Sequence, residues 1–386
     1  MLKKRMAHTI VLLIVLLSLF ASVPLSVLAQ SKSTELIGMV ADRNGRVHIF
    51  NAVTNSVVGT IDLPNYYSTG DVLISKTGKL GFVTTFASEL WVIDLTTSTP
   101  TLASGTNPIP ISNRGNDISI TPDGKFLVVS GVLSGPLSIV DIASRTEVST
   151  FGTGSPSAVD VLNDGSVLVA DYSAGEIRKL SINSDGTITD TGEILSVPYP
   201  MNAYGSPDAQ AGFVVTYSYP SSIQSFILSG LAPVDSYDLN VGGRSGAMHP
   251  SGDKVYVRTL SHLYAFSFDS TTGSLGTSPL FDIPVGWSES YLGMDQMAIT
   301  PDGTQIYVPE TDVINIYDAE SGVLLATLSD PVFFSLTGIY FTEVNDSPGG
   351  WSNGNKSGWE SESPPGLEEN GQTPPGFEKG EKYGWD

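Results

Sequence analysis

An all-β ring built from repeated four-stranded sheets is the fold that this sequence predicts, and three observations lead to it. Short alternating strands recur about every 40 to 50 residues between Leu36 and Val344. Turn-forming residues are abundant, with 40 Gly and 24 Pro in 386 residues. No segment of this range shows a sustained helical period, which argues against an α/β fold.

The clearest repeat is a strand that runs into a Pro-Asp-Gly turn. It occurs at Asp117–Gly124 (DISITPDG) and at Gln296–Gly303 (QMAITPDG), and second strands follow at Phe126–Ser130 and Gln305–Val308. Pro presets φ, Asp bonds its own backbone, and Gly takes the position with positive φ. These segments therefore predict tight hairpins.

Third and fourth strands follow each hairpin. The third strand often ends in Asp, as at Leu90–Asp94, Leu137–Asp141, Leu263–Asp269 and Val313–Asp318. A turn then leads to a more polar fourth strand such as Val323–Leu328. Four short antiparallel strands per repeat are typical of a propeller blade.

Counting the inner strands predicts seven blades. Six complete blades begin near Asp71, Asp117, Ala158, Asn202, Ser245 and Gln296. The stretch Leu36–Leu63 has three strands without an inner one, and the last strand, Thr337–Thr342, has no partners after it. Joining the two ends gives a seventh blade and removes the unpaired edges of an open sheet. The expected fold is an all-β, seven-bladed β-propeller closed by a blade split between both ends of the chain.

A family resemblance rests on these same segments. The repeats at Thr121–Ser130 (TPDGKFLVVS) and Thr300–Pro309 (TPDGTQIYVP) resemble the YVTN propeller repeat, as do the third-strand ends VIDL and IVDI. The segment His249–Val257, followed by YAFSFD and TGSL, is similar to repeats of the seven-bladed lactonase family. The resemblance implies the architecture, and it leaves activity open because such repeats serve surface, binding and enzymatic proteins alike.

A candidate site lies where the inner strands begin, at the channel mouth. The aligned first positions are Asp71, Asp117, Ala158, Asn202, Ser245, Gln296 and Thr337, and beside them lie Tyr67, Asn113, Arg114, Asn116, Arg244, Glu289 and Asp295. We predict ligand binding by Asp71, Asp117, Asn202, Ser245, Gln296, Arg114, Arg244 and Asp295. These oxygen-rich side chains suit a hard cation such as Ca²⁺ or a small polar ligand. The alternative is that they bond backbone groups and tie neighbouring blades together.

Catalytic residues are harder to find. The chain has 4 His and 0 Cys, which excludes thiolate metal sites, disulfides and cysteine nucleophiles. Neither a three-histidine site nor a Ser-His-Asp arrangement can be located by spacing. Lactone hydrolysis needs a base and an oxyanion partner, for which Arg114, Arg244 or Arg258 with Asp117, Asp295 or His262 are conceivable pairs. No cofactor-binding signature is evident, and an enzyme is not favoured.

The chain begins with an expected signal peptide, residues 1–29. Lys3, Lys4 and Arg5 precede an apolar run, and Val27-Leu28-Ala29 offers small residues for cleavage after Ala29. An uncleaved anchor is the alternative, and no later segment is apolar enough to span a membrane. We therefore expect a secreted, periplasmic or cell-surface protein. The net charge of -21 argues against nucleic acid and anionic lipid as partners.

The expected propeller spans 30–344, and a different composition follows in 345–386. Ser347–Glu360 and Thr373–Asp386 match as a repeated motif rich in Pro, Gly, Glu and Trp. With so little aliphatic content this tail is expected to be extended in isolation. It is either a spacer or a set of aromatic stickers for a protein or cell-envelope polymer.

Two functions follow from these features. The first is an exported binding or scaffold propeller that presents its channel-mouth loops to a ligand or partner. The second is an extracytoplasmic lactonase-like hydrolase, with a cation as an optional helper. A quinoprotein-like role has no ligand signature in the sequence to support it.

Overall fold

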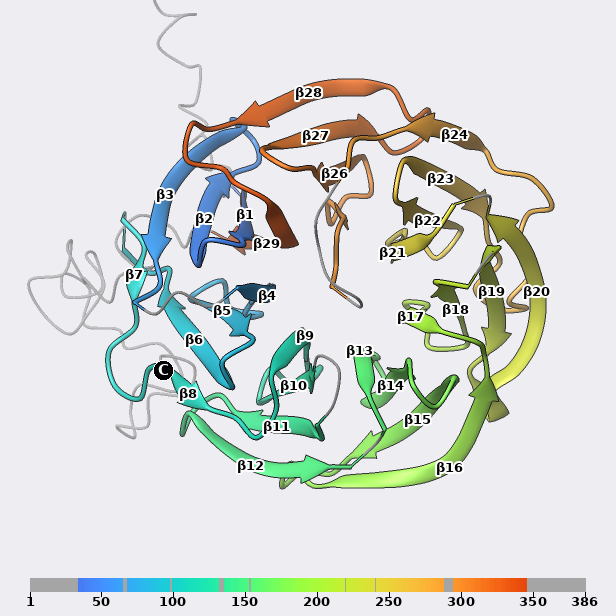
Figure 1. Cartoon of the computed structure of the whole chain (residues 1–386), viewed down its shortest axis with the longest axis horizontal. Helices are drawn as coiled ribbons and strands as arrows, with labels where there is room; N and C mark the ends of the chain where they lie inside the picture. Colours follow the sequence, from blue (N-terminus) through green and yellow to red (C-terminus); the bar gives the residue numbers. More distant parts are fainter. Residues whose placement is uncertain are drawn as a thin grey trace, which may run out of the picture. The chain divides into compact units, whose positions relative to one another are not determined.

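The computed structural model describes residues 34–345 except 65–67, 98, 132–134, 153, 219, 240 and 288–293. The expected signal peptide and tail lie outside the described residues, as do Tyr67 and Glu289. Every described strand belongs to a sheet of the ring shown in Figure 1. Within the described part of the chain, no helix is long and apolar enough to cross a membrane.

Seven sheets form the blades, and their strands follow one another along the chain. Blade 1 contains β29 (Leu336–Asn345), β1 (Thr34–Asp42), β2 (Arg46–Asn51) and β3 (Ser56–Asp62). Blade 2 contains β4 (Thr69–Ile74), β5 (Leu80–Thr85), β6 (Glu89–Asp94), β7 (Thr101–Leu102) and β8 (Ile109–Pro110). Blade 3 contains β9 (Gly115–Ile120), β10 (Phe126–Gly131), β11 (Leu137–Asp141) and β12 (Thr146–Phe151).

The other four blades repeat the pattern. Blade 4 contains β13 (Pro156–Val161), β14 (Ser166–Asp171), β15 (Glu176–Ile182) and β16 (Ile188–Ser196). Blade 5 contains β17 (Pro200–Gly205), β18 (Ala211–Thr216), β19 (Ser221–Ile227) and β20 (Ala232–Leu239), with the short 3₁₀ helix η1 (Ser229–Leu231) before β20. Blade 6 contains β21 (Gly243–Met248), β22 (Lys254–Thr259), β23 (His262–Ser267) and β24 (Phe281–Pro284), and blade 7 contains β25 (Ala298–Ile299), β26 (Gln305–Pro309), β27 (Val313–Asp318) and β28 (Leu324–Ser329).

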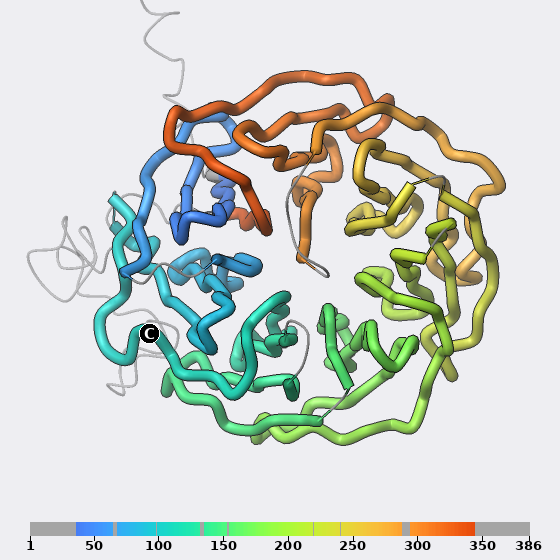
Figure 2. Tube along the Cα trace, viewed as in Figure 1, coloured from blue at the N-terminus to red at the C-terminus, as the bar shows by residue number. Residues whose placement is uncertain are grey.

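The ring closes as the sequence predicts. The last strand, β29, is the inner strand of blade 1 and pairs with β1, so the blue and red ends of the described trace meet in one sheet (Figure 2). Leu336 and Ile339 of β29 are buried against Tyr307 of blade 7. Both the seven-bladed fold and the split blade are therefore confirmed.

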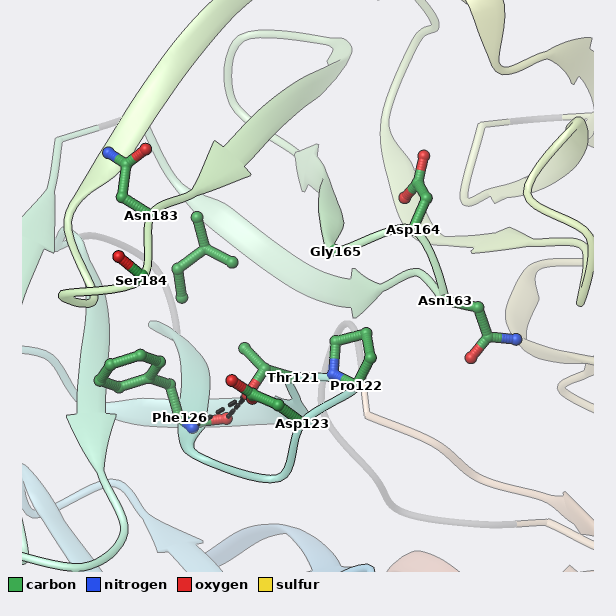
Figure 3. Close-up of a pocket in the computed structure, with 10 residues that line it drawn as sticks. Thr121, Pro122, Asp123, Phe126, Asn163, Asp164, Gly165, Asn183 and Ser184 are labelled. Atoms are coloured by element: carbon green, nitrogen blue, oxygen red, sulfur yellow. Dashed lines mark hydrogen bonds between the residues drawn. The ribbon is translucent and has the colours of Figure 1, made fainter.

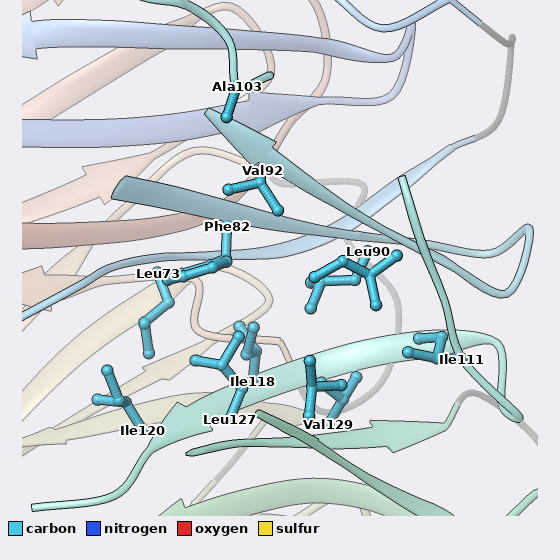
Figure 4. Close-up of a cluster of buried hydrophobic side chains, with 12 residues drawn as sticks. Leu73, Phe82, Leu90, Val92, Ala103, Ile111, Ile118, Ile120, Leu127 and Val129 are labelled. Atoms are coloured by element: carbon cyan, nitrogen blue, oxygen red, sulfur yellow. The ribbon is translucent and has the colours of Figure 1, made fainter. Parts of the chain in front are cut away.

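The hydrophobic core lies between the blades. The described residues form seven clusters of buried side chains, one for each pair of neighbouring blades. In the cluster of Figure 4, Phe82 and Leu90 of blade 2 face Leu127 and Val129 of blade 3. The second strands β10 and β14 are buried along their whole length because each sheet packs against two others.

Predicted strand boundaries differ from the observed ones by one to two residues at most ends. Six of the seven inner strands begin earlier than expected: β4 begins at Thr69 and β9 at Gly115, two residues before Asp71 and Asp117. The exception is β25, which begins at Ala298, two residues after Gln296. The fourth strand of blade 2 is divided into β7 and β8, both paired with β6. Pro108 lies in the segment between them, and its nitrogen cannot donate to the ladder.

Candidate functional site at the channel mouth

The inner strands share a bulge at the level of the predicted ring. Five of them, β4, β9, β13, β17 and β21, shift register against the second strand there. In β4 the shift falls between Thr69 and Val72, next to Asp71. Bulges commonly re-aim side chains beside binding sites. Inner strands line the centre of the ring in Figure 1.

Many ring side chains tie neighbouring blades together. The Val159 amide of blade 4 donates to Oδ2 of Asp117 at 2.7 Å, and the Gln296 amide of blade 7 donates to Oγ of Ser245 at 3.2 Å. A hydroxyl on the second strand adds a further link in blade 2. Thr84 accepts from the Asp71 amide at 2.7 Å and donates to the Asn116 carbonyl of blade 3 at 2.8 Å. The structural alternative drawn from the sequence therefore holds for these bonds.

Three of the predicted carboxyl groups nevertheless converge. Asp71, Asp117 and Asp295 each offer an oxygen within 4.8 Å of the others. They come from blades 2, 3 and the segment before β25, and the Asp295 amide donates to Oδ2 of Asp71 at 3.1 Å. We call Asp71, Asp117 and Asp295 the acidic cluster.

The acidic cluster is electrostatically unfavourable when fully ionised. Burial raises the pKa of Asp71 well above its ordinary value, and the charge of Asp295 raises it further. The pKa of Asp117 is raised by burial and then by the charge of Asp71, while that of Asp295 is raised by burial and by Asp117. Carboxyl groups in such surroundings hold protons or share a cation.

Three more channel residues belong to this environment. Burial raises the pKa of Asp160, in β13, to about 6, and Oδ2 of Asp160 accepts from the Gly205 amide at 2.8 Å. The Tyr204 hydroxyl donates to Oδ1 of Asp295 at 2.8 Å and accepts from the Gly246 amide at 3.0 Å. The pKa of Tyr340 is raised by burial and by Asp295 and Asp160. Carboxyl and phenol groups from blades 1 to 5 and from the segment before β25 thus face one another.

Sequence reasoning missed Asp160, Tyr204 and Tyr340. Asp160 and Tyr204 lie two residues after the ring positions Ala158 and Asn202. Because side chains alternate along a strand, the second residue after each ring position returns to the same face. Reading that second layer across all blades would have found both residues.

The remaining predicted residues are placed around the cluster. Asn202, Ser245 and Gln296 are buried at their ring positions. Arg114 is exposed, and its Nε donates to the Phe86 carbonyl at 2.9 Å. Arg244 lies over the ring of Tyr217 with its guanidinium carbon 5.0 Å from the ring centroid. Among the described residues, neither arginine forms an ion pair with a carboxyl group of the cluster.

The conceivable catalytic pairs with Arg258 or His262 are wrong. Arg258 is 1% exposed, and its guanidinium donates to the carbonyl groups of Gln296, Pro309 and Gly286. It therefore joins blades 6 and 7 rather than facing a substrate. His262 is the first residue of β23, and its Nδ1 lies 2.6 Å from Oδ1 of Asp282 on the outermost strand. This pair is directed to the rim of the ring, away from the channel.

A separate pocket of about 240 Å³ is lined by turns of blades 3 and 4 (Figure 3). Antiparallel order places its turns, Thr121–Phe126 and 163–165, at the ends of the strands far from the mouth. Its carboxylates are satisfied locally: Asp123 accepts from the Thr121 hydroxyl at 2.6 Å, and Asp164 from the Ser166 hydroxyl at 2.6 Å. The residues that line this pocket include no cluster of buried carboxyl groups like that of the channel.

Known proteins share the fold with this chain. It resembles a functionally unknown protein from Desulfotomaculum acetoxidans with a TM-score of 0.69 and 21% identity over 79% of this chain and 98% of that one. It resembles a putative 6-phosphogluconolactonase from Bacteroides fragilis with a TM-score of 0.65 and 17% identity, over 80% and 98% of the two chains. It also resembles the periplasmic gluconolactonase of Pseudomonas aeruginosa, with a TM-score of 0.65 and 16% identity over 81% of this chain and 100% of that one.

These likenesses define the chain as a seven-bladed β-propeller with lactonase-like neighbours, and at such identities they show the fold alone. No protein-family model and no curated protein matches the sequence. The YVTN assignment of the repeat therefore stays a prediction.

Proposed function

We propose that this chain is an exported binding propeller whose channel mouth holds a divalent cation, with Ca²⁺ the best fit. The proposal rests on the acidic cluster, in which oxygens of Asp71, Asp117 and Asp295 lie within 4.8 Å of one another. Ca²⁺ binds oxygen at 2.3–2.6 Å, so two oxygens on one ion are at most about 5 Å apart. The spacing therefore fits a single ion.

Electrostatics supports the same proposal. The interactions that raise the pKa of Asp295 are burial and the charges of Asp117 and Asp160, and the hydrogen bond from Tyr204 offsets them only in part. A cation would relieve this repulsion and hold the carboxylates in their ionised form. Binding of the ion would then release protons, so affinity should rise as pH rises.

Calcium titration of the purified protein tests the proposal. We expect saturable binding by calorimetry and a rise in Tm of a few degrees at about 100 times Kd, following mass action. Asp117→Asn should abolish both effects, and Asp185→Asn, on an exposed turn, is the control. Unchanged Tm in millimolar Ca²⁺, Mg²⁺ and Mn²⁺ would refute the cation site.

A second candidate function is lactone hydrolysis, favoured by Asp160. Its pKa of about 6 suits a general base near neutral pH. The carboxylate would take a proton from water, the hydroxide would attack the carbonyl carbon, and the ring C–O bond would break. The leaving oxygen would take the proton that Asp160 removed from the water, which regenerates the base, and a protonated carboxyl of the cluster would donate to the developing oxyanion.

A panel of sugar lactones, assayed with and without EDTA, separates the two functions. Turnover that is lost in Asp160→Asn and retained in Asp185→Asn would establish the hydrolase. No turnover above the uncatalysed rate in either condition would exclude it and leave the binding propeller.

A further inference from the structure

A second group of side chains at the mouth face consists of three tyrosines on loops and one arginine at the start of a strand. None of the four belongs to the acidic cluster. Tyr172 follows β14, Tyr199 precedes β17, Tyr217 follows β18, and Arg244 is the second residue of β21. Backbone bonds hold the loops together: the Val197 amide donates to the Gly175 carbonyl, and the Tyr217 amide to the Tyr199 carbonyl, both at 2.9 Å. The four side chains thus sit on a fixed part of the ring spanning blades 4, 5 and 6.

The aromatic rings are available to a ligand. Tyr172 and Tyr199 have ring centroids 5.5 Å apart at 50°, and the pKa of Tyr172 is raised by burial and by both Tyr199 and Tyr217. Tyr199 is 53% exposed and Tyr217 37% exposed. Tyr199 lies between Pro198 and Pro200 and has a φ of 51°. Bulky residues seldom adopt this conformation unless their surroundings hold them in it.

Arg244 supplies an uncompensated positive charge. Its guanidinium stacks on Tyr217, and its Nε is buried without a hydrogen-bond partner among the described residues. Partial burial lowers the pKa of Arg244, with only Tyr217 acting against it. Other arginines differ: Arg178 pairs with Glu176 and Asp190, and Arg258 donates to three carbonyl groups. In a chain of net charge -21, a cation placed in this way is suited to accept an anion.

We propose that Tyr172, Tyr199, Tyr217 and Arg244 form a binding site for a sugar acid, a ring that bears a carboxylate. Tyrosine faces pack against the C–H face of a sugar ring, and a guanidinium receives a carboxylate through two parallel hydrogen bonds. The site goes beyond the proposed cation binding and does not depend on it, because none of its residues belongs to the acidic cluster.

Binding of galacturonate in EDTA tests the proposal. We expect saturable binding by calorimetry or ligand-detected NMR at pH 7, with ring protons in contact with protein. Arg244→Gln should weaken it by about 10- to 100-fold, the cost of losing a hydrogen bond to a charged group. Tyr217→Ala should weaken it by about tenfold through lost stacking and loss of the support for Arg244. Both variants should keep the Ca²⁺ response of the parent protein.

Matched controls and competing ligands make the outcome decisive. Arg178→Gln, on a paired arginine of blade 4, should leave galacturonate affinity unchanged. Equal affinity for glucose would overturn the role of the carboxylate, and tighter binding of benzoate would overturn the sugar ring. A weak ligand has a Kd of about 1 mM. If the folded parent protein shows no binding at about 10 mM galacturonate, ten times that Kd, the site itself is overturned.

Discussion

Two aspartates of one repeat, six positions apart, behave in opposite ways. Asp117 lies on the inner strand, where burial and the charge of Asp71 raise its pKa well above the ordinary value. Asp123 lies in the Pro-Asp-Gly turn at the other end of the strand, where the Thr121 hydroxyl and the Lys125 amide lower its pKa. The same residue type is thus favoured as a neutral acid at the mouth and as an ion at the turn.

The difference shows what each carboxyl group depends on. Asp123 is satisfied by atoms within two residues of it, so its interactions form wherever the hairpin forms. The acidic cluster is assembled from separate blades and exists only in the closed ring. Ionisation therefore stabilises the turn and opposes the channel, a cost that natural folds mostly tolerate where a ligand is held.

Removing β29 should have the largest effect on stability, because it opens the ring in which the acidic cluster is assembled. A chain that stops at Ser335 loses Leu336, Ile339 and Phe341 from the core between blades 7 and 1. Each buried apolar side chain costs about 2–5 kcal/mol to remove, and a whole domain has only about 5–15 kcal/mol. We expect aggregation or loss of a cooperative thermal transition, measured by calorimetry and light scattering.

A chain that stops at Asn345 is the matched control, because it keeps β29. It should melt as the full chain does. A stable monomer from the chain that stops at Ser335, with unchanged Tm, would contradict closure by the split blade.

Replacing Asp160 tests whether an ionised carboxylate in the channel destabilises the fold. Its pKa rises from 3.8 to about 6 on folding, so the folded state holds this proton more tightly than the unfolded state. The stability from Asp160 is therefore fully present below about pH 4 and is lost as pH rises to 6. Asp160→Asn should stabilise the protein at pH 7 by on the order of 2 to 3 kcal/mol and flatten this pH dependence.

Urea unfolding at pH 4, 5, 6 and 7 measures the effect. The Asn side chain can still accept from the Gly205 amide, so the bond to blade 5 is retained. A variant that is less stable than the parent at every pH would mean that Asp160 stabilises the fold as an ion.

Much of the fold was readable from the sequence, because blades are local. The turns at Thr121–Gly124 and Thr300–Gly303 and the orphan strand at the end of the chain were enough to predict seven blades and a split one. The early start of the inner strands was missed, since Thr69 and Gly115 pair through a bulge that leaves no pattern in the alternation.

The site was predictable only in part. Alignment on the turns placed Asp71 and Asp117 together, and Asp295 was chosen as a neighbour of the ring. Which groups meet across a channel depends on the blade geometry, so the pairing of Tyr204 with Asp295 and of Asp160 with the Gly205 amide could not be derived from spacing. Arg258 was misjudged because a buried arginine satisfied by carbonyl groups looks the same in sequence as a free one.

Loss of the Thr84 hydroxyl should have the next largest effect on stability, because this uncharged group links blades 2 and 3 at the channel mouth. It accepts from the Asp71 amide and donates to the Asn116 carbonyl, and it is fully buried. Thr84→Val keeps the shape and leaves two buried backbone groups without this partner, which should cost about 2 kcal/mol in urea unfolding. Thr96→Val, on an exposed turn, is the control, and an equal cost for both variants would show that the link between blades adds nothing.

The smallest effect is expected at the turn. Asp123→Ala removes the acceptor for the Thr121 hydroxyl and the Lys125 amide, at a cost of about 1 kcal/mol because solvent screens an exposed carboxylate. Since folding lowers the pKa of Asp123, its contribution is present above pH 4 and is lost as pH falls through the folded value. The stability difference between parent and variant should thus stay constant from pH 5 to 8 and shrink below pH 4, the reverse of the trend for Asp160. A difference that grows as pH falls would show that the two ends of the repeat obey the same electrostatics.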